Sequence, residues 1–464
     1  MAAIGAAAAA FVGANYIRSG PFSPTSKKIF GFGMPKYPIN GTVEPGYESV
    51  QTAFANNFAT GDEIGASFCA FVGGKCVVDL WGGFKDAELK TPYGEHDINV
   101  IFSSGKACAS LVVLSLIDKG LLRWDQRVSE IWPEFAAGGK EKVTVEELMS
   151  HRGGVSWLEE EFRPTIAETA DLDKLEARIA AQPHTHGGVT TKSYHAVTRG
   201  WLLNALVRRV DPRGRTIGTI YREEIAPALG LDLVCGMRPE DESKWSKLSP
   251  YPFIRLAMRA LLPPWVHRHA PLEPLFQSSV GQKDTPTLKS LMGSGPKDLI
   301  PDVLYNDKTF LACETPSSSI LSNGRALATL GALMCAGGTF RGYTLFSNPS
   351  TLESAYSHAE EEPSVDMVTF FDVHYTKAGF AHVTDVRVPD WDMIPFPARW
   401  RRPGLEWYGW GGYGGSYFFW CPTLQVSVGY VPNALHATAL GDIRSASIIE
   451  ALMDVAEGKS ASKL

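Results

Sequence analysis

A serine and a lysine one helical turn apart are the residues whose types and spacing most clearly allow covalent chemistry. Ser103 and Lys106 are the first and last residues of the tetrapeptide Ser-Ser-Gly-Lys, an S-x-x-K motif. On a helix, positions i and i+3 share one face, so the Lys106 amine can reach the Ser103 hydroxyl. A hydroxyl needs a nearby base to become a nucleophile, and burial helps a lysine to lose its charge and act as that base. The pair therefore predicts acyl transfer through Ser103.

The context of Ser103 distinguishes it from two other copies of the same motif. The copies at 294–297 and 460–463 fall in a Gly-Pro loop and in a polar tail. Only Ser103 follows an apolar run, at 100–102, and precedes a longer one, at 107–117, which predicts a helix buried on all sides. The free N–H groups at the start of such a helix can stabilise an oxyanion. A serine N-cap followed by a lysine is also a common structural arrangement, so the motif alone leaves both interpretations open.

Six further segments occur in a characteristic order around Ser103. They are DLWGG at 79–83, DKGLL at 118–122, WPEF at 132–135, TVEELMSHRGG at 144–154, YHAVTRGW at 194–201 and WGGYGGS at 410–416. Together they resemble the serine β-lactamase-related family, and within it the carboxylesterases of the class C β-lactamase type. The similarity extends over about residues 47–456, nearly the whole chain. A set of ordered segments is far more specific than any one of them.

The resemblance implies a role for each of three residues in the reaction. Ser103 would be acylated, and Lys106 and Tyr194 would share the work of moving its proton. Physical chemistry makes a role for Tyr194 credible, because a phenol near a lysine ammonium can ionise below its usual pKa of ~10 and shuttle a proton. No cofactor and no metal ion is expected for this chemistry.

The resemblance also assigns a substrate-binding strand near the C-terminus. Trp410, Gly411 and Gly412 stand where relatives carry K-T-G or H-x-G. The two glycines would allow the strand to approach the substrate closely, since glycine has no side chain. The N–H groups of Ser103 and Tyr413 would then form the oxyanion hole, and Trp410 and Tyr413 would face the substrate.

Two departures from the family pattern bear on the substrate. Trp410 replaces the lysine of K-T-G, which removes a cation able to pair with a substrate carboxylate. Ala196 replaces the asparagine of Y-x-N, which removes an amide able to hydrogen-bond a β-lactam side chain. Both changes disfavour β-lactam hydrolysis and leave acyl transfer intact. We therefore expect a serine hydrolase acting on an uncharged small-molecule ester or lactone.

Two alternatives from other functional classes remain open at this point. The chain could be a catalytically silent relative that binds a ligand or assembles with itself. It could also be a peptidase or β-lactamase that uses the same residues. Ser103, Lys106 and Tyr194 are all present, which disfavours the silent alternative.

Other motifs have weaker claims to chemistry. Residues 409–414 satisfy G-x-G-x-x-G, but an aromatic strand is expected after them instead of the helix that a dinucleotide fold requires. His184 and His186 resemble half of a metal site, and no further ligands occur at suitable spacing, so a solvated loop is expected. His151 and His195 lie within the family segments and are expected to support the site without taking part in the chemistry.

The elements that position these residues alternate along the chain between strands and helices. Two β-type runs flank Gly73 and Gly74, and two more flank a Pro-Thr pair at 422–423, so each end of the chain contains a predicted hairpin. Helical patterns fill the middle, including 199–210 and 324–335. If the two hairpins share one antiparallel sheet, the middle must form a helical insertion beside it. The expected fold is therefore α+β, of the β-lactamase/transpeptidase-like type, with two lobes and a cleft between them.

The expected domain organisation has one large catalytic domain between two short ends. The predicted parts are an apolar segment and lead at 1–45, a hydrolase domain at 46–456 and a tail at 457–464; within the domain, the sheet lobe takes about 46–100 and 400–456, and the helical lobe about 101–399. The apolar run at 2–12 is too short to span a bilayer. A docked segment and a weak membrane anchor are both open interpretations of it.

Composition and the C-terminal residues indicate the cellular setting. Hydrophobic residues make up 44% and charged residues 20% of the 464 residues, which is typical of a globular protein. The net charge is −6 without a Lys/Arg-rich block, which argues against a nucleic-acid partner. Seven scattered cysteines indicate reduced thiols in an intracellular compartment. The final Ser462, Lys463 and Leu464 form the peroxisomal address that an import receptor reads, so we expect a peroxisome-type organelle.

Overall fold

The computed structural model describes most of the chain. The described residues are 2–261, 284–298, 305–362, 364–387, 404–438 and 441–461, so the predicted targeting tripeptide lies outside them. Within these ranges, none of the helices is both long and apolar enough to cross a membrane. All seven cysteines lie in the described ranges and are free thiols, as the sequence predicts.

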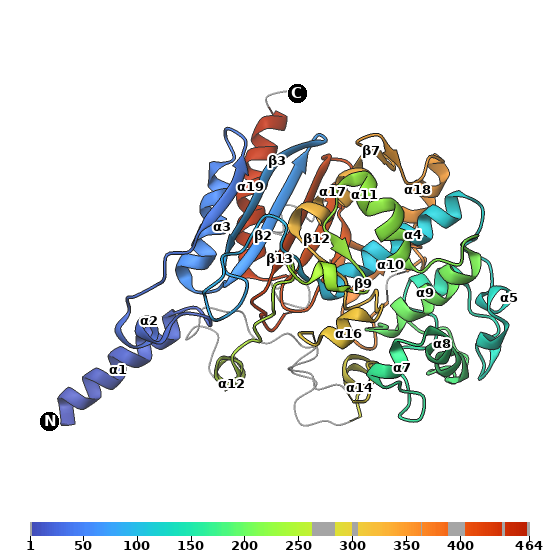
Figure 1. Cartoon of the computed structure of the whole chain (residues 1–464), viewed down its shortest axis with the longest axis horizontal. Helices are drawn as coiled ribbons and strands as arrows, with labels where there is room; N and C mark the ends of the chain where they lie inside the picture. The colour runs from blue at the N-terminus through green and yellow to red at the C-terminus, as the bar shows by residue number, and fades with distance from the viewer. Residues whose placement is uncertain are drawn as a thin grey trace.

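One eight-stranded antiparallel sheet forms the centre of the fold (Figure 1). Its strand order is β1-β3-β2-β13-β12-β11-β10-β9, so strands from the two ends of the chain pair at its middle. The strands are β1 Ile39–Val43, β2 Gly65–Val72, β3 Lys75–Gly83, β9 Asp372–Tyr375, β10 Ala381–Arg387, β11 Tyr408–Gly411, β12 Tyr417–Cys421 and β13 Val426–Pro432. Both predicted hairpins are present as β2–β3 and β12–β13, and the predicted α+β class is confirmed.

The β2–β3 hairpin shows how local sequence sets the sheet register. Gly73 and Gly74 form its two-residue turn and both have positive φ, 58° and 75°. This is the type I′ pattern, whose twist matches that of the flanking strands and which side chains other than glycine disfavour. The turn therefore fixes the pairing of Lys75 with Val72, and the rest of the hairpin follows.

The sheet extends beyond the segments from which the sequence predicts it. β1 lies in the region assigned to the lead, and β9 and β10 lie in the region assigned to the helical lobe. β1 contains a glycine and is mostly exposed, and β9 is four residues long. Such strands are too short and too polar to give a clear alternating pattern, so only pairing with neighbouring strands identifies them.

Helices cover both faces of the sheet (Figure 1). α3 (Glu48–Thr60) and α19 (Ile443–Ala461) pack against each other and against the face that carries Phe68. α17 (Gly324–Cys335) packs against the opposite face, which carries Cys69. Successive residues of β2 thus face different layers, as the pleat of a strand requires.

The remaining helices precede the sheet or lie in the insertion between β3 and β9. They are α1 Ala2–Arg18, α2 Thr25–Phe30, η1 Phe102–Ser104, α4 Gly105–Asp118, α5 Val128–Ile131, η2 Pro133–Ala136, α6 Val145–Met149, α7 Ile166–Thr169, α8 Leu172–Ala181, α9 Thr198–Val210, α10 Ile217–Ile220, η3 Tyr221–Ile225, α11 Ala226–Leu229, η4 Pro239–Asp241, α12 Phe253–Leu261, α14 Pro286–Gly293, α16 Lys308–Ala312 and α18 Pro349–Tyr356. Two small sheets complete the fold, formed by β4 Asn99–Val100, β6 Leu321–Ser322 and β5 Leu233–Val234, and by β7 Thr339–Phe340 and β8 Tyr343–Thr344. The helical insertion and the sheet meet at η1 and β11, where the candidate site lies.

Candidate active site

Ser103 lies in a tight turn that leads into the buried helix α4. The turn is η1. In the helix that follows, every residue from Gly105 to Leu116 is buried, so the helix is covered on all sides, as the sequence predicts. Phe102, directly before the serine, has a φ of 46°, in the left-handed region that a bulky side chain rarely adopts. Strained residues of this kind cluster at functional sites, where surrounding structure holds them. The turn leaves Ser103 only partly buried, so its hydroxyl is reachable.

Lys106 lies one turn along α4 and its amine points at the serine. Its Nζ atom is 3.0 Å from the Ser103 Oγ atom, 2.7 Å from the Ala196 carbonyl oxygen and 3.1 Å from that of Ser317. The side chain is 2% exposed. Burial, and secondarily the charge of Arg199, lower the pKa of Lys106 well below its usual value. Burial thus makes the amine easier to deprotonate, which favours a role as general base.

Tyr194 approaches Ser103 from the segment that precedes α9. Its hydroxyl is 2.7 Å from the Ser103 Oγ atom, and the Trp410 indole nitrogen donates to it at 3.1 Å. Burial raises the pKa of Tyr194 above its usual value. The expectation from sequence that this phenol ionises more easily than usual is therefore wrong. Burial outweighs the hydrogen bonds with Ser103 and Trp410 and the charge of Arg199, each of which acts to lower this pKa.

These contacts form one chain of hydrogen bonds in which every donor has an acceptor. The Lys106 Nζ atom donates to the two carbonyl oxygens and to the Ser103 Oγ atom. Once deprotonated, the amine keeps two N–H groups for the carbonyl oxygens and can turn its lone pair to the Ser103 hydroxyl proton. Ser103 then accepts from Tyr194, and Tyr194 accepts from Trp410. The arrangement prepares Ser103 to lose its proton toward Lys106.

Arg199 is a functional candidate that the sequence analysis missed. Its guanidinium is fully buried and donates to the carbonyl oxygens of Met149 and Lys106 and to the Ser110 hydroxyl. The fixed positive charge disfavours a second cation on Lys106. The sequence signal for Arg199 is an arginine among the mostly apolar residues that α9 buries. Charged side chains are seldom fully buried unless they have a partner or a function.

β11 runs directly against the nucleophile turn. A Cβ atom on Gly412 would lie 2.3 Å from the Ile101 carbonyl oxygen and 2.2 Å from the Ser416 Oγ atom, so only glycine fits there. Ser416 donates to Ile101 at 2.6 Å, and the Ser104 hydroxyl lies 3.0 Å from that of Ser416. Gly412 thus permits a close approach between two main-chain segments of the protein, where the sequence analysis expected an approach to substrate. Gly411 ends β11 and is buried.

The predicted substrate-facing residues differ in their exposure. Trp410 is 4% exposed and stacks on Tyr194, with ring centroids 5.7 Å apart. Tyr413 is 41% exposed, and its ring lies edge-on to Phe102, which also contacts Tyr305. Phe102, the residue before Ser103, therefore connects the exposed ring of Tyr413 with the ring of Tyr305. The assignment of the oxyanion hole to the N–H groups of Ser103 and Tyr413 stays a prediction.

A buried ion network anchors the loop that carries Tyr413. The Arg444 guanidinium donates to the Gly414 carbonyl oxygen at 2.7 Å and pairs with Glu63 at 2.9 Å and with Asp442 at 2.7 Å. Arg444 and Glu63 are both fully buried. Because a buried charge that loses its partner is costly, this network holds the loop against the sheet.

The histidines near the site have structural roles, as the sequence predicts. His151 stacks on Tyr194 with ring centroids 4.6 Å apart, and its Nδ1 atom accepts from the His195 main-chain N–H. The His195 Nε2 atom accepts from the Val155 N–H, and burial lowers the pKa of His195 to about 3. Both rings therefore remain neutral and position the segment of Tyr194.

Neither rival motif forms the site that its pattern allows. The G-x-G-x-x-G segment at 409–414 continues into β12, without the helix that a dinucleotide site needs. His184 accepts from the main-chain N–H of His186 within their own loop. Among the described residues, three or more His, Cys, Asp or Glu side chains with metal-ligand spacing occur only on β2 and β3, away from this pair.

The fold and the catalytic set define a class of protein: a serine hydrolase with lysine and tyrosine beside the nucleophile. A model of the beta-lactamase family matches residues 50–453. The chain therefore belongs to the beta-lactamase family, whose serine hydrolases include carboxylesterases.

A curated relative supports this assignment over part of the chain. The esterase/beta-lactamase LipL of Mycobacterium tuberculosis (strain ATCC 25618 / H37Rv) is 34% identical over 205 residues, which cover 44% of this chain and 46% of LipL. The match thus spans less than half the length of that relative. It indicates common ancestry and does not carry the whole activity of LipL to this chain.

Solved structures match over most of the chain. A penicillin-binding protein homologue from Caulobacter crescentus is 31% identical with a TM-score of 0.73, covering 90% of this chain and 100% of that one. A family VIII carboxylesterase is 27% identical with a TM-score of 0.74, again covering 90% and 100%. A class C beta-lactamase in complex with cefoxitin is 11% identical with a TM-score of 0.54, covering 88% and 98%, and shows the fold alone.

Proposed function

We propose that this serine hydrolase is a carboxylesterase that cleaves an uncharged ester or lactone through an acyl-enzyme on Ser103. The observation that carries the proposal is the hydrogen-bond chain from Trp410 through Tyr194 and Ser103 to Lys106. It supplies a reachable nucleophile, a neutral base and a proton donor within contact of one another. These are the requirements of covalent acyl transfer.

Acylation uses the contacts of Ser103 with Lys106 and Tyr194. The Lys106 lone pair takes the Ser103 proton as the Oγ atom attacks the substrate carbonyl carbon, and negative charge develops on the carbonyl oxygen. The ester C–O bond then breaks, and the leaving alkoxide takes the proton of the Tyr194 hydroxyl. The Lys106 ammonium, 4.7 Å from the centroid of the Tyr194 ring, returns a proton to the phenol. Lys106 and Tyr194 are then neutral again.

Deacylation uses the same groups in reverse. Water takes the place of the departed alcohol. Tyr194 accepts a proton from this water as it passes its own proton to Lys106, and the water oxygen attacks the acyl carbon. The tetrahedral species expels the Ser103 oxygen, which regains its proton from Lys106. The products are a carboxylic acid and the free enzyme, so one ester and one water are consumed in each cycle.

The residues around Ser103 favour an uncharged substrate. Trp410 stands where relatives carry a lysine that would pair with a substrate carboxylate. Its indole N–H donates to Tyr194. The rings of Tyr305 and Tyr413 pack on Phe102, the residue directly before Ser103. Apolar surface of this kind binds acyl chains and small apolar alcohols better than charged groups.

A panel of substrates tests the proposal. We expect the purified protein to hydrolyse p-nitrophenyl esters with kcat/KM at least about 100-fold above that for a chromogenic cephalosporin and for short peptides. Ser103→Ala should remove the ester activity and also labelling by a fluorophosphonate probe, because both depend on the Ser103 oxygen.

One matched variant makes the result decisive. Ser104→Ala removes the neighbouring hydroxyl, which contacts Ser416 and the Trp410 carbonyl and does not contact the base. It should keep probe labelling. A native protein that neither labels nor cleaves any ester would support a silent binding relative, and faster cleavage of the cephalosporin or the peptides would overturn the esterase assignment.

We also propose that residues 462–464 direct the protein to a peroxisome-type organelle through its import receptor. The support is the Ser-Lys-Leu sequence and the small polar residues before it. A fluorescent fusion that keeps these residues at its C-terminus should accumulate in peroxisomes, and Leu464→Ala should leave it diffuse. Equal distributions of the two proteins would contradict the proposal.

A further inference from the structure

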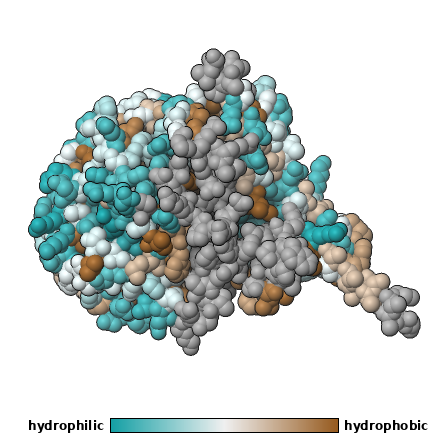
Figure 2. Space-filling view, turned by 180° about the vertical axis from the view of Figure 1, so that it is seen from behind, coloured by the Kyte–Doolittle hydropathy of each residue, from teal (hydrophilic) through white to brown (hydrophobic). Residues whose placement is uncertain are grey.

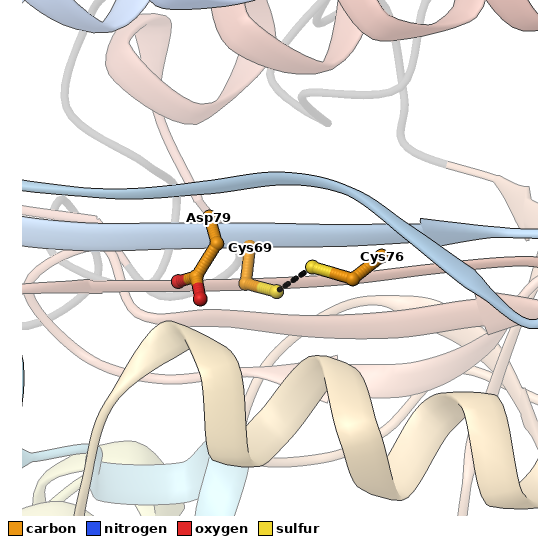
Figure 3. A group of neighbouring side chains, drawn as sticks. All are labelled: Cys69, Cys76 and Asp79. Carbon is orange, nitrogen blue, oxygen red and sulfur yellow. Dashed lines mark hydrogen bonds between the residues drawn. The ribbon is translucent and has the colours of Figure 1, made fainter. Parts of the chain in front are cut away.

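Two thiols and a carboxylate meet on the α17 face of the sheet, apart from the catalytic set (Figure 3). The Sγ atoms of Cys69 and Cys76 are 3.7 Å apart. A carboxylate oxygen of Asp79 lies within 4.8 Å of both. Cys69 is fully buried, whereas Cys76 and Asp79 are partly exposed, so the group is reachable from one side. Figure 3 shows the two sulfur atoms pointing toward each other.

A β-bulge brings the three side chains to one face. Cys76 and Asp79 are three positions apart, which in a regular strand would place them on opposite faces. Ala70 lies opposite Val78, but the next residue of β2 lies opposite Cys76, so Val77 is an extra residue in β3. This bulge returns Cys76 to the face of Asp79. Bulges of this kind re-aim side chains and are frequent beside functional sites.

We propose that Cys69, Cys76 and Asp79 bind a thiophilic divalent cation of the Zn²⁺ type. Two thiolates bound at about 2.3 Å to one tetrahedral ion lie about 3.8 Å apart. The observed separation of 3.7 Å matches this value, so the strands need no rearrangement to admit the ion. Binding releases the two thiol protons to solvent, and the carboxylate completes a set of three protein ligands.

Charged side chains beside the three ligands can hold the ligands in position. Arg325 on α17 donates to the Asp79 carboxylate and also pairs with Glu95 at 2.8 Å. A ligand carboxylate is commonly oriented by a hydrogen bond to its other oxygen, and Arg325 is placed to do this. Three protein ligands leave a fourth position for water on the partly exposed side. The site is independent of the proposed esterase chemistry, because none of its ligands contacts Ser103, Lys106 or Tyr194.

Cobalt titration of the whole protein tests the site. Metal-free, reduced protein should bind one equivalent of Co²⁺ with a thiolate-to-cobalt charge-transfer band, and Zn²⁺ should displace it. Cys69→Ser and Cys76→Ser should each abolish this band. Asp79→Asn should weaken binding by about 10- to 100-fold. Cys335→Ser changes a partly buried thiol elsewhere and should leave the titration unchanged.

Hydrolysis and peptide mapping separate the remaining outcomes. Ester hydrolysis should be the same in Cys76→Ser as in the native protein, so a failure of the esterase proposal does not affect this one. The proposal is overturned if no equivalent of Co²⁺ binds, or if the band persists in the Cys69→Ser/Cys76→Ser double variant. It is also overturned if the thiols form a disulfide under mild oxidant in the presence of Zn²⁺. That bond would link the two tryptic peptides that meet after Lys75, because one contains Cys69 and the other Cys76.

A second inference rests on a different part of the molecule, where α1, α2 and α12 meet (Figure 1). The Arg255 guanidinium of α12 stacks on the Tyr16 ring of α1 at 4.0 Å and donates to Ser19 at 2.8 Å. The Asn15 side chain of α1 donates to the Ile29 carbonyl oxygen of α2 at 3.1 Å. Segments far apart in sequence are therefore joined in one helical group.

This helical group exposes large apolar side chains from all of its parts. Those more than half exposed are Phe11 on α1, Phe30 and Phe32 at the end of α2, and Phe253, Ile254 and Leu261 on α12. Figure 2 shows the apolar surface of the projecting N-terminal helix. Exposed apolar surface on this scale marks a binding surface for a protein or a membrane.

The charge of this region indicates whether the surface binds a protein or a membrane. Residues 1–43 contain four basic residues and no Asp or Glu, and α12, at 253–261, likewise contains no Asp or Glu. The chain as a whole has a net charge of −6, so this region has the opposite sign to the rest. A second copy that docked through the same face would bring two basic surfaces together, which is unfavourable. An anionic bilayer offers both apolar and anionic contacts.

We infer that this helical group docks the enzyme on an anionic phospholipid surface without spanning it. The native protein should sediment with vesicles of phosphatidylcholine and phosphatidylserine, and its binding should fall as salt rises. Phe30→Ser/Phe32→Ser should weaken binding by about tenfold or more, because two anchoring rings are lost. Val189→Ser is the matched control, since Val189 is 65% exposed on a distant loop.

Hydrolysis of a soluble ester without vesicles should be equal in all of these variants. Equal sedimentation of the Phe30→Ser/Phe32→Ser variant and the native protein would overturn the inference. So would binding that is the same on pure phosphatidylcholine. A concentration-dependent dimer in light scattering that the same double variant loses would identify a second copy as the occupant instead.

Discussion

The indole nitrogen of Trp410 donates to the phenol oxygen of Tyr194 at 3.1 Å, and the two rings stack. In the proposed mechanism, Trp410, which stands where relatives carry a lysine, therefore orients the proton donor Tyr194. This relation changes the site in two ways, since it removes a cation from the substrate side and adds a hydrogen bond to Tyr194. The predictions below test this relation and the contacts around it.

Trp410→Phe should keep the stacking on Tyr194 and remove the N–H donor. We expect kcat for a p-nitrophenyl ester to fall about five- to tenfold, as loss of one neutral hydrogen bond predicts, with little change in KM. The melting temperature should stay close to that of the native protein because the ring still fills the core. An unchanged kcat would show that the indole hydrogen bond does not orient Tyr194.

The pH dependence of kcat/KM should report the neutral state of Lys106. Its pKa is lowered well below the usual value, so activity should rise with pH through that lowered pKa and then level off. Arg199→Met removes a neighbouring positive charge, which raises the pKa of Lys106 and should move the rise to higher pH by roughly one unit. Arg199→Lys keeps the charge and should leave the profile near that of the native protein. A rise at the same pH in the methionine variant would contradict this electrostatic role.

Gly412→Ala should damage both stability and activity. The added Cβ atom would lie 2.3 Å from the Ile101 carbonyl oxygen, which belongs to the nucleophile turn and cannot move freely. We expect a loss of about 1–3 kcal/mol in the free energy of unfolding and at least a tenfold loss in kcat, measured by urea titration and ester hydrolysis. Gly293→Ala is the control, because nothing lies within 4 Å of its added Cβ atom. Similar behaviour of the two variants would show that β11 tolerates a side chain.

Arg444→Met should leave Glu63 buried without its partner. We expect a loss of about 3–5 kcal/mol in the free energy of unfolding, since an unpaired buried charge is costly. Adding Glu63→Gln should recover part of this loss, which a double-mutant cycle measures. Additive effects of the two substitutions would mean that the pair does not interact in the folded protein.

The elements with strong local signals could be predicted from sequence. The glycine pair between β2 and β3 and the uniformly apolar residues of α4 specify their structures within a few neighbouring positions. β9 has only four residues, and β10, although seven residues long, is identified as a strand by its pairing with β9 and β11 across the sheet. Such pairing depends on tertiary structure that a local pattern does not contain.

The residues of the candidate site also divide into those that a local pattern predicts and those that depend on tertiary structure. Ser103 lies in η1 and Lys106 lies three positions later, at the start of α4, so spacing alone predicts their contact. The placement of Tyr194 required resemblance to known proteins, and the structure brings it to Ser103. Arg199 and the protonation state of Tyr194 could not be predicted, because both depend on how completely the surrounding helices exclude water.

The pairing of β2 with β13 has a consequence for how the protein is made. A ribosome produces Ser103 and Lys106 early, but Trp410 and the strands that flank it arrive only when translation is nearly finished. Until then β2 has no neighbour on that side and Tyr194 has no indole to hold it. A chain that ends before β11 would therefore contain Ser103 and Lys106 without the strand that completes the candidate site.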